Sequence, residues 1–193
     1  MRADAQANRE ALLKAARTLF AAQGPAVPFS QIAAEAGVGV ATLYRHFPTP
    51  EDLMLGLIER VLEQMAEVCA RHLPGMQREP QATWPTVIDD IVALELGTLV
   101  PQLLGGRDLA DLPAEILAAR EQVIDAAGTL VDLAKEAGLV RADASSIAVL
   151  AGLGAITRPL PSVLDAIAPG MRDWLVEVYV AGLRPSATPA ESG

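Results

Sequence analysis

The stretch from residue 32 to residue 47 constrains the fold of this chain most, because it predicts two short helices joined by a tight turn. Ile32 and Ala36 place apolar side chains at helical spacing in the first helix. Gly37 follows where that helix must end, since glycine enters the left-handed backbone region without steric cost. The pattern is typical of a helix-turn-helix, with residues 40–47 as its second helix.

The second helix of this motif has an apolar side and a polar side. Val40, Leu43 and Phe47 are expected to face the protein. The polar side carries hydroxyl, phenol, guanidinium and imidazole groups, which can bind phosphates and base edges. We therefore predict a DNA recognition helix. The predicted DNA-binding residues are Gly39, Val40, Ala41, Thr42, Tyr44, Arg45 and His46.

Two motifs occur in this region at fixed spacing: Ile-Ala-x-x-Ala-Gly-Val at residues 32–38, and Leu-Tyr-x-His-Phe at residues 43–47. An apolar series precedes them, formed by Leu13, Ala16, Leu19, Phe20 and Gly24. On these residues, the segment 9–53 resembles the TetR family of bacterial transcriptional regulators. The resemblance implies operator DNA as a partner and an inducer bound within a larger helical domain.

The sequence departs from the family pattern at two places. Gly39 stands where a serine usually caps the recognition helix. Thr49 and Pro50 stand where a basic residue is often found. Both departures weaken the expected grip on phosphate and leave the expected fold unchanged.

Composition favours an all-α fold, because alanine and leucine dominate and no alternating apolar run predicts a strand. Charge is divided unevenly: residues 1–47 carry five Lys or Arg and three Asp or Glu, whereas residues 48–193 carry 10 and 21. Because phosphate repels an acidic body, this asymmetry predicts two functional parts. We expect an N-terminal three-helix helix-turn-helix domain and a larger C-terminal helical bundle.

The predicted domains are residues 1–48 for DNA binding, residues 49–184 for effector binding and dimerisation, and a disordered tail at 185–193. Residues 1–8 are expected to fray, and residues 74–82 to form a polar loop. Besides the helix-turn-helix, the predicted helices cover approximately residues 8–23, 51–72, 85–104, 113–136, 143–157 and 169–183.

Two charged residues interrupt apolar helical stripes of the larger domain. Glu95 lies between Ile91 and Leu99, and Arg120 lies between Ile116 and Val123. A charge on a buried stripe is costly unless it is paired. Glu95 and Arg120 therefore form either a structural ion pair or the polar part of a ligand cavity. The predicted ligand-binding residues are Met65, Cys69, Ile91, Glu95, Leu99, Ile116, Arg120 and Val123.

The last two predicted helices carry more apolar surface than one bundle face needs. Aromatic residues such as tryptophan and tyrosine are favoured in interfaces. We therefore predict a homodimer, and the alternative is that these stripes only complete the core of the protomer. The predicted interface residues are Leu150, Leu153, Ile156, Trp174, Leu175, Val178 and Tyr179.

Other classes of protein are disfavoured. The single cysteine, Cys69, excludes a disulfide within one chain, and no apolar run approaches the length of a membrane span. No signal-peptide pattern occurs, so we expect a cytoplasmic protein.

Met65, Cys69 and His72 have the spacing of a soft-metal site, but a core stripe is the simpler interpretation. No nucleotide-binding or hydrolase motif occurs, so we expect neither an enzyme nor a cofactor.

The sequence therefore predicts a sequence-specific transcriptional regulator, a repressor released from its operator by a small apolar or amphipathic effector. Two alternatives stay open. One is a similar protein without an inducer, whose body serves dimerisation or a protein partner. The other is a helical metabolite-binding or enzymatic protein with a vestigial DNA-binding domain.

Overall fold

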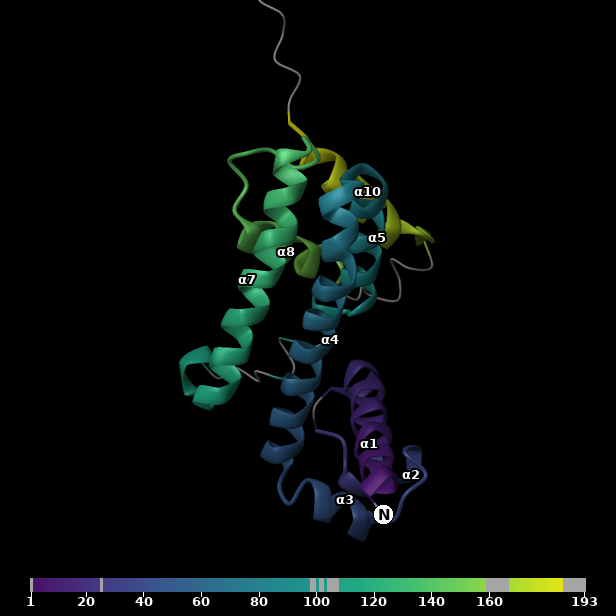
Figure 1. Cartoon of the computed structure of the whole chain (residues 1–193). Coiled ribbons are helices and arrows are strands. Elements are labelled where there is room, and N and C mark those ends of the chain that lie inside the picture. The colour runs from purple at the N-terminus through teal and green to yellow at the C-terminus, as the bar shows by residue number, and fades with distance from the viewer. Residues whose placement is uncertain are drawn as a thin grey trace, which may run out of the picture. The chain divides into compact units, whose positions relative to one another are not determined.

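The computed structural model describes residues 2–24, 26–97, 100, 103, 108–158 and 167–185 (Figure 1). Among these residues it contains helices and no strand, which confirms the all-α prediction. The elements are α1 (Arg2–Gln23), α2 (Phe29–Glu35), α3 (Val40–His46), α4 (Pro50–Arg78), α5 (Pro80–Ala93), the 3-10 helix η1 (Leu109–Asp111), α7 (Ala114–Glu136), α8 (Ser146–Ile156) and α10 (Met171–Gly182). No helix of the described residues has the length and hydropathy that a membrane crossing needs.

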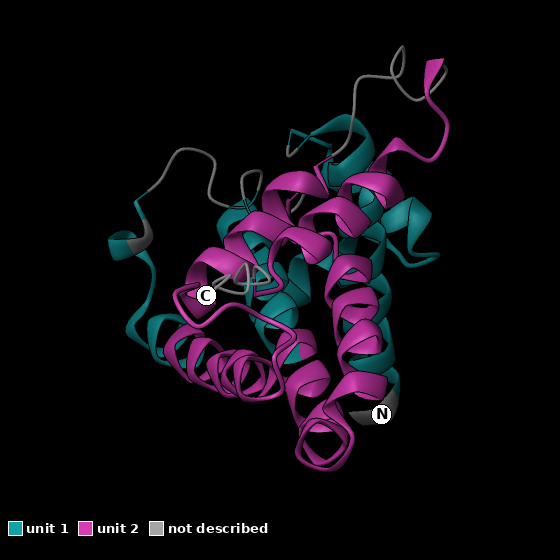
Figure 2. Cartoon of the chain, turned by 90° about the horizontal axis from the view of Figure 1, so that it is seen from above, with its two compact units in different colours: residues 1–63, 98–119 teal, residues 64–97, 120–193 magenta. Residues whose placement is uncertain are grey.

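The chain forms two compact units, shown in teal and magenta in Figure 2. Unit 1 consists of residues 1–63 and 98–119, and unit 2 of residues 64–97 and 120–193. By sequence, α4 and α7 each contribute residues to both units. The predicted disordered tail lies outside the described residues from position 186 onward.

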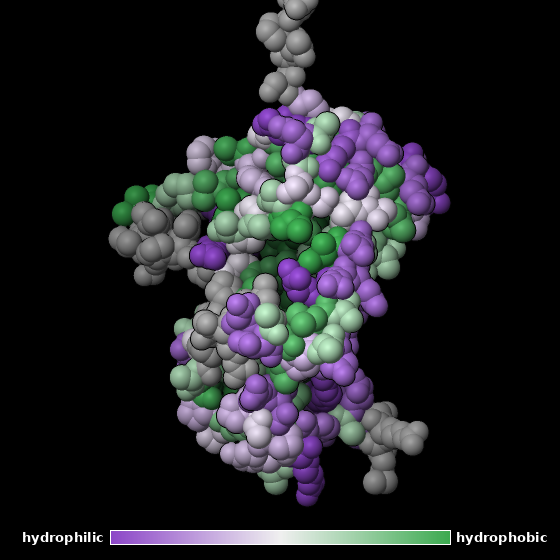
Figure 3. All heavy atoms as spheres, turned by 90° about the vertical axis from the view of Figure 1, so that its left-hand side faces the viewer, coloured by the Kyte–Doolittle hydropathy of each residue, from purple (hydrophilic) through white to green (hydrophobic). Residues whose placement is uncertain are grey.

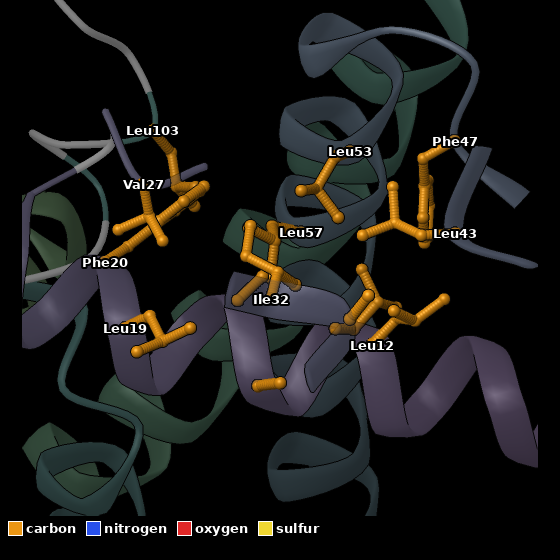
Figure 4. Packing of buried hydrophobic residues seen from close by; sticks show 14 residues of the cluster. Leu12, Leu19, Phe20, Val27, Ile32, Leu43, Phe47, Leu53, Leu57 and Leu103 are labelled. Carbon is orange, nitrogen blue, oxygen red and sulfur yellow. The ribbon is translucent and has the colours of Figure 1, made fainter. Parts of the chain in front are cut away.

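Unit 1 has its own hydrophobic core, to which α1, α2, α3 and the start of α4 contribute (Figure 4). Leu12, Ile32 and Leu43 are completely buried in it. Leu43 and Phe47 lie at one end of the cluster, and Phe20 lies near the other. Helical spacing of the apolar residues on α1 and α2 therefore produces the three-helix domain that the sequence predicts.

Helix α1 begins at Arg2, so the prediction that residues 1–8 fray is wrong for residues 2–8, and Met1 lies outside the described residues. Asp4 lies in the first turn, where a carboxylate interacts favourably with the helix dipole. The Gln6 side chain donates a hydrogen bond to Glu10 one turn later, at 3.2 Å. With no glycine or proline in this segment, the helix can begin as early as Arg2.

Helix α4 begins as predicted. The Thr49 backbone N–H donates to the Asp52 carboxylate at 2.9 Å, and the Asp52 N–H donates to the Thr49 hydroxyl at 3.1 Å. These reciprocal bonds form a capping box. Pro50 occupies the first helical position, where its missing N–H is not needed.

The end of α4 differs from the prediction. The helix continues through Pro74 to Arg78, and α5 begins at Pro80, so the expected loop at residues 74–82 is wrong. A proline inside a helix removes one backbone hydrogen bond. The extra turn buries Met76 almost completely, which offsets this loss.

Helix α5 ends at Ala93, about ten residues earlier than predicted. Glu95 then adopts a left-handed backbone conformation with φ 51°, which no continuing helix allows. The backbone of Gly97 approaches the backbone of Gly154 in α8 so closely that a Cβ would not fit. Packing against α8 therefore determines where α5 stops.

A polar cluster connects α4 with α5 inside unit 2. The Arg71 guanidinium donates to Asp90 Oδ2 at 2.8 Å, and His72 Nε2 lies 2.8 Å from the same oxygen. The hydrogen bond to His72 is the largest influence that holds the pKa of Asp90 below its usual range; desolvation by partial burial opposes it. The folded state therefore favours the Asp90 carboxylate.

The Asp90→Asn variant is expected to be less stable than the wild type at pH 7 by only about 0.5 kcal/mol, because more than a third of the Asp90 side chain is exposed. Because the folded-state pKa is lowered, the stabilisation is present above the unfolded carboxyl pKa of about 3.9 and is lost as pH falls through the folded-state pKa. Urea unfolding at pH 7 and pH 3 measures the difference. The same deficit at both pH values would contradict the assignment.

Candidate nucleic-acid interface

The turn between α2 and α3 is built by Gly37, whose φ is 68°. The Gly37 N–H donates to the Ala34 carbonyl at 3.1 Å, and the Val38 N–H donates to the Ala33 carbonyl at 3.0 Å. This pair of bonds is a Schellman motif, which satisfies the last carbonyls of α2. The predicted helix, glycine turn and second helix are confirmed.

Helix α3 is anchored by two buried side chains. Leu43 is completely buried and Phe47 is 3 % exposed. Gly39 precedes the helix in an extended conformation and provides no side-chain cap, but its carbonyl accepts from the Thr42 N–H at 2.8 Å. Val40 is 39 % exposed, so the expectation that it faces inward is wrong. Val40 is the first residue of α3, about one turn before Leu43 and two turns before Phe47.

The other side of α3 is open to solvent. Tyr44 is 52 % exposed and Arg45 is exposed, whereas Thr42 and His46 are partly buried. Gly39 and Ala41 have no bulky side chain and are exposed. In the space-filling view, the lower end of the molecule, where α1–α3 lie, is mostly hydrophilic (Figure 3). The exposed side of α3 therefore offers a guanidinium and a phenol to a negatively charged ligand. The buried side of the same short helix holds these groups rigidly in place.

One aromatic neighbour of this surface was missed in the sequence. The rings of Phe29 and Tyr44 lie 5.3 Å apart between centroids and are tilted by 49°. Phe29 begins α2, and this contact orients the Tyr44 ring. The two residues belong to different helices, so no helical spacing in the sequence could reveal the contact.

The predicted ligand-binding residues have different environments. Met65, Cys69, Ile91 and Val123 are buried in unit 2, and burial raises the pKa of the Cys69 thiol. Ile116 is also buried but belongs to unit 1, and Leu99 lies outside the described residues. The described residues contain no group of three or more metal-ligating side chains placed to hold an ion.

The two charged residues of this set do not behave as expected from helical spacing. Glu95 lies beyond the end of α5, its side chain is 44 % exposed, and it pairs with Arg172 of α10 at 3.6 Å. Arg120 is half-buried on α7. The expectations that Glu95 continues the stripe of α5 and faces the interior are therefore wrong, and its ion pair connects it to α10.

The α8–α10 pair divides the predicted interface residues into two groups. Leu153 is 1 % exposed and belongs to the core of the protomer. Trp174 and Val178 are 55 % and 48 % exposed, and Leu150, Ile156, Leu175 and Tyr179 are partly buried. Ile147, on the same helix as Leu150 and Leu153, is 59 % exposed. An interface on these helices can therefore use Trp174, Val178 and Ile147, but Leu153 is unavailable.

Tyr179 connects the same two helices within the protomer. Its hydroxyl lies 3.1 Å from the Ala148 carbonyl and 3.2 Å from the Val149 carbonyl. The ring end occupies the space that a side chain at Gly152 would fill. Burial raises the pKa of the Tyr179 phenol, so the hydroxyl stays protonated as a donor. This contact fixes α10 against α8.

Two family models match the chain. The model described as bacterial regulatory proteins, tetR family, matches residues 12–57. The model described as the C-terminal domain of SbtR-like transcriptional regulators matches residues 79–185, which is more than half of the chain.

Individual proteins are similar as well. A curated HTH-type transcriptional regulator of Staphylococcus aureus (strain USA300) is 41 % identical over 64 residues, which are 33 % of this chain and 35 % of that regulator. The match thus spans about a third of the curated relative's length. The crystal structure of a TetR transcription regulatory protein from Mycobacterium vanbaalenii is 31 % identical, with a TM-score of 0.60 over 95 % of this chain and 99 % of that chain. The crystal structure of a TetR transcriptional regulator from Streptomyces coelicolor is 28 % identical. Its TM-score is 0.59 over 93 % of this chain and 99 % of that chain.

Proposed function

The chain belongs to the TetR family of bacterial transcriptional regulators, and from this premise we propose that it is a repressor that binds operator DNA as a homodimer and leaves it when a small molecule binds. The observation that carries this proposal is α3, a short helix with two buried anchors and an exposed phenol and guanidinium. We assign DNA binding to residues 1–48, and effector binding and dimerisation to residues 49–184.

The exposed side of α3 is the proposed reading surface. Arg45 supplies charge and forked donors, and the Tyr44 hydroxyl supplies a neutral donor to a phosphate or base edge. Gly39, Val40, Ala41, Thr42 and His46 complete the proposed contact surface. Because Gly39 has no hydroxyl, the grip on phosphate depends more strongly on the remaining donors.

Replacing Tyr44 or Arg45 by alanine is expected to weaken operator binding by more than about 1 kcal/mol, because each removes a donor that the exposed surface offers to DNA. An operator selected from a random DNA pool, followed by anisotropy titration at several salt concentrations, measures the loss. Arg78→Ala is the matched control, since Arg78 is an exposed basic residue at the far end of α4. Equal operator affinity for wild type and the Tyr44→Ala, Arg45→Ala double variant would refute the proposal.

The proposed effector site lies among the apolar residues of the larger domain. The buried side chains of Met65, Cys69, Ile91 and Val123 support an apolar or amphipathic effector, with Arg120 as a partner for its polar group. Release follows from linkage between the two sites. An effector that binds the conformation with low operator affinity more tightly shifts the protein toward that conformation, by as much as its affinities for the two conformations differ. Helix α4 is the proposed lever, because its residues belong to both units.

An effector found by thermal-shift screening is expected to lower operator affinity by about 5- to 150-fold, the range of a typical coupling energy. Arg120→Met should remain folded and bind the operator, but require more effector for release. Arg78→Met serves as the control for loss of one positive charge. If no apolar or amphipathic molecule stabilises the protein, the body serves dimerisation or a protein partner instead.

A further inference from the structure

Gly56 lies on α4 directly against the residue that ends the recognition helix. A Cβ at this position would lie 2.8 Å from Cε1 of Phe47, closer than real Cβ contacts. Phe47 is the C-cap of α3, and its N–H donates to the Leu43 carbonyl at 2.8 Å. Since the Phe47 ring is 3 % exposed, it has little room to move away. The missing side chain of Gly56 therefore determines how closely the end of α3 approaches α4.

Arg9 of α1 also contacts the Phe47 ring. Its guanidinium carbon lies 5.6 Å from the centroid of the Phe47 ring, within the range of a cation–π contact. The guanidinium also donates to the Glu59 carboxylate of α4 at 3.1 Å. Arg9, Phe47, Gly56 and Glu59 thus connect α1, the end of α3 and α4, and we call this group the α3 joint.

We propose that Arg9 and Gly56 are positioning residues for operator recognition, acting through Phe47 on the orientation of α3. A partly exposed ion pair such as Arg9–Glu59 contributes little to stability, so we assign it an effect on the orientation of α3 instead. A base-reading helix that tilts by a small amount loses its aligned contacts with base edges, whereas unspecific attraction to phosphate is hardly affected. The joint therefore controls the preference for operator over other DNA.

Gly56→Ala tests the joint directly. We expect a folded protein with at least tenfold lower affinity for the selected operator and nearly unchanged affinity for random DNA. Adding Phe47→Leu removes the ring edge that the new methyl group meets, so Gly56→Ala, Phe47→Leu should bind the operator more tightly than Gly56→Ala alone. A role in stability alone would move the unfolding midpoint without changing the ratio of operator to random-DNA affinity.

Arg9→Gln provides a second test that does not add volume to the core. We expect about tenfold weaker operator binding with an unchanged salt slope. If Arg9 instead contacts a phosphate, the slope of log K against log salt falls by about 0.9, which would overturn the positioning role. Arg60→Gln is the matched control, because Arg60 also forms an ion pair between α4 and α1, with Glu10 at 3.4 Å. This variant should keep its operator affinity within about twofold of the wild type.

This inference rests on the proposed DNA-binding role, and the two can fail separately. If the wild type selects no DNA sequence, both fail. If the wild type and the Tyr44→Ala variant behave as expected but Gly56→Ala and Arg9→Gln keep wild-type operator preference, only the joint is refuted.

Discussion

Gly97→Ala is expected to lose at least about 3 kcal/mol of unfolding free energy, a large fraction of the stability of a typical domain. A Cβ at this position would penetrate the carbonyl oxygen of Gly154 and also lie 3.1 Å from Cγ of Arg158. The obstacle is backbone of α8, which cannot rotate away as a side chain can. The methyl group therefore fits only if α8 or the segment after α5 moves. Urea unfolding followed by far-ultraviolet circular dichroism measures the loss.

Gly154→Ala is the matched control for this prediction. Among the residues that the structure describes, its Cβ would meet the Gly97 nitrogen at 3.9 Å, an ordinary contact, and nothing closer. Because Gly154 lies within α8, alanine there should stabilise the helix by up to about 1 kcal/mol. Two neighbouring glycines thus have opposite expected effects. A Gly97→Ala protein with the wild-type urea midpoint would show that this segment does not pack against α8.

The second large effect is expected from charge introduced on α10. Trp174→Arg combined with Val178→Arg should give a folded monomer, since both side chains are about half exposed in the protomer and a buried charge would arise only in a dimer interface. A monomer can bind only one half-site at a time. Operator affinity should therefore fall by more than about a hundredfold, because linking two binding modules raises the overall affinity by at least about that factor. Sedimentation and operator titration of the same sample measure both outcomes.

Ile167→Arg is the control for this variant, because Ile167 is 73 % exposed and lies outside α8 and α10. It should sediment and bind the operator like the wild type. A wild-type protein that sediments as a monomer at micromolar concentration would refute the dimer. An unfolded Trp174→Arg, Val178→Arg variant would indicate that α10 completes the core of the protomer.

The sequence by itself determined the features that depend on residues within one or two helical turns. Gly37 ends α2 because its left-handed backbone needs only local bonds. Thr49 and Asp52 begin α4 by capping each other, and Gly138 ends α7 with φ 71°. The same local spacing identified Leu43 and Phe47 as the buried anchors of α3. The family and the helix-turn-helix were accordingly predicted correctly.

Only the tertiary structure decided features that depend on packing between distant segments. Helix α4 continues through Pro74 because burial of Met76 compensates a local cost, and α5 stops early because Gly97 meets α8. The partner of Glu95 is Arg172, which no spacing along one helix could show. The contact of Gly56 with Phe47 likewise appears only once α3 and α4 are folded together. The physical reason is that glycine turns and capping boxes are completed by groups a few residues away along the chain. The ends of α4 and α5 and the side-chain partners of Glu95 and Phe47 follow instead the free energy of packing between distant segments, which the local sequence does not contain.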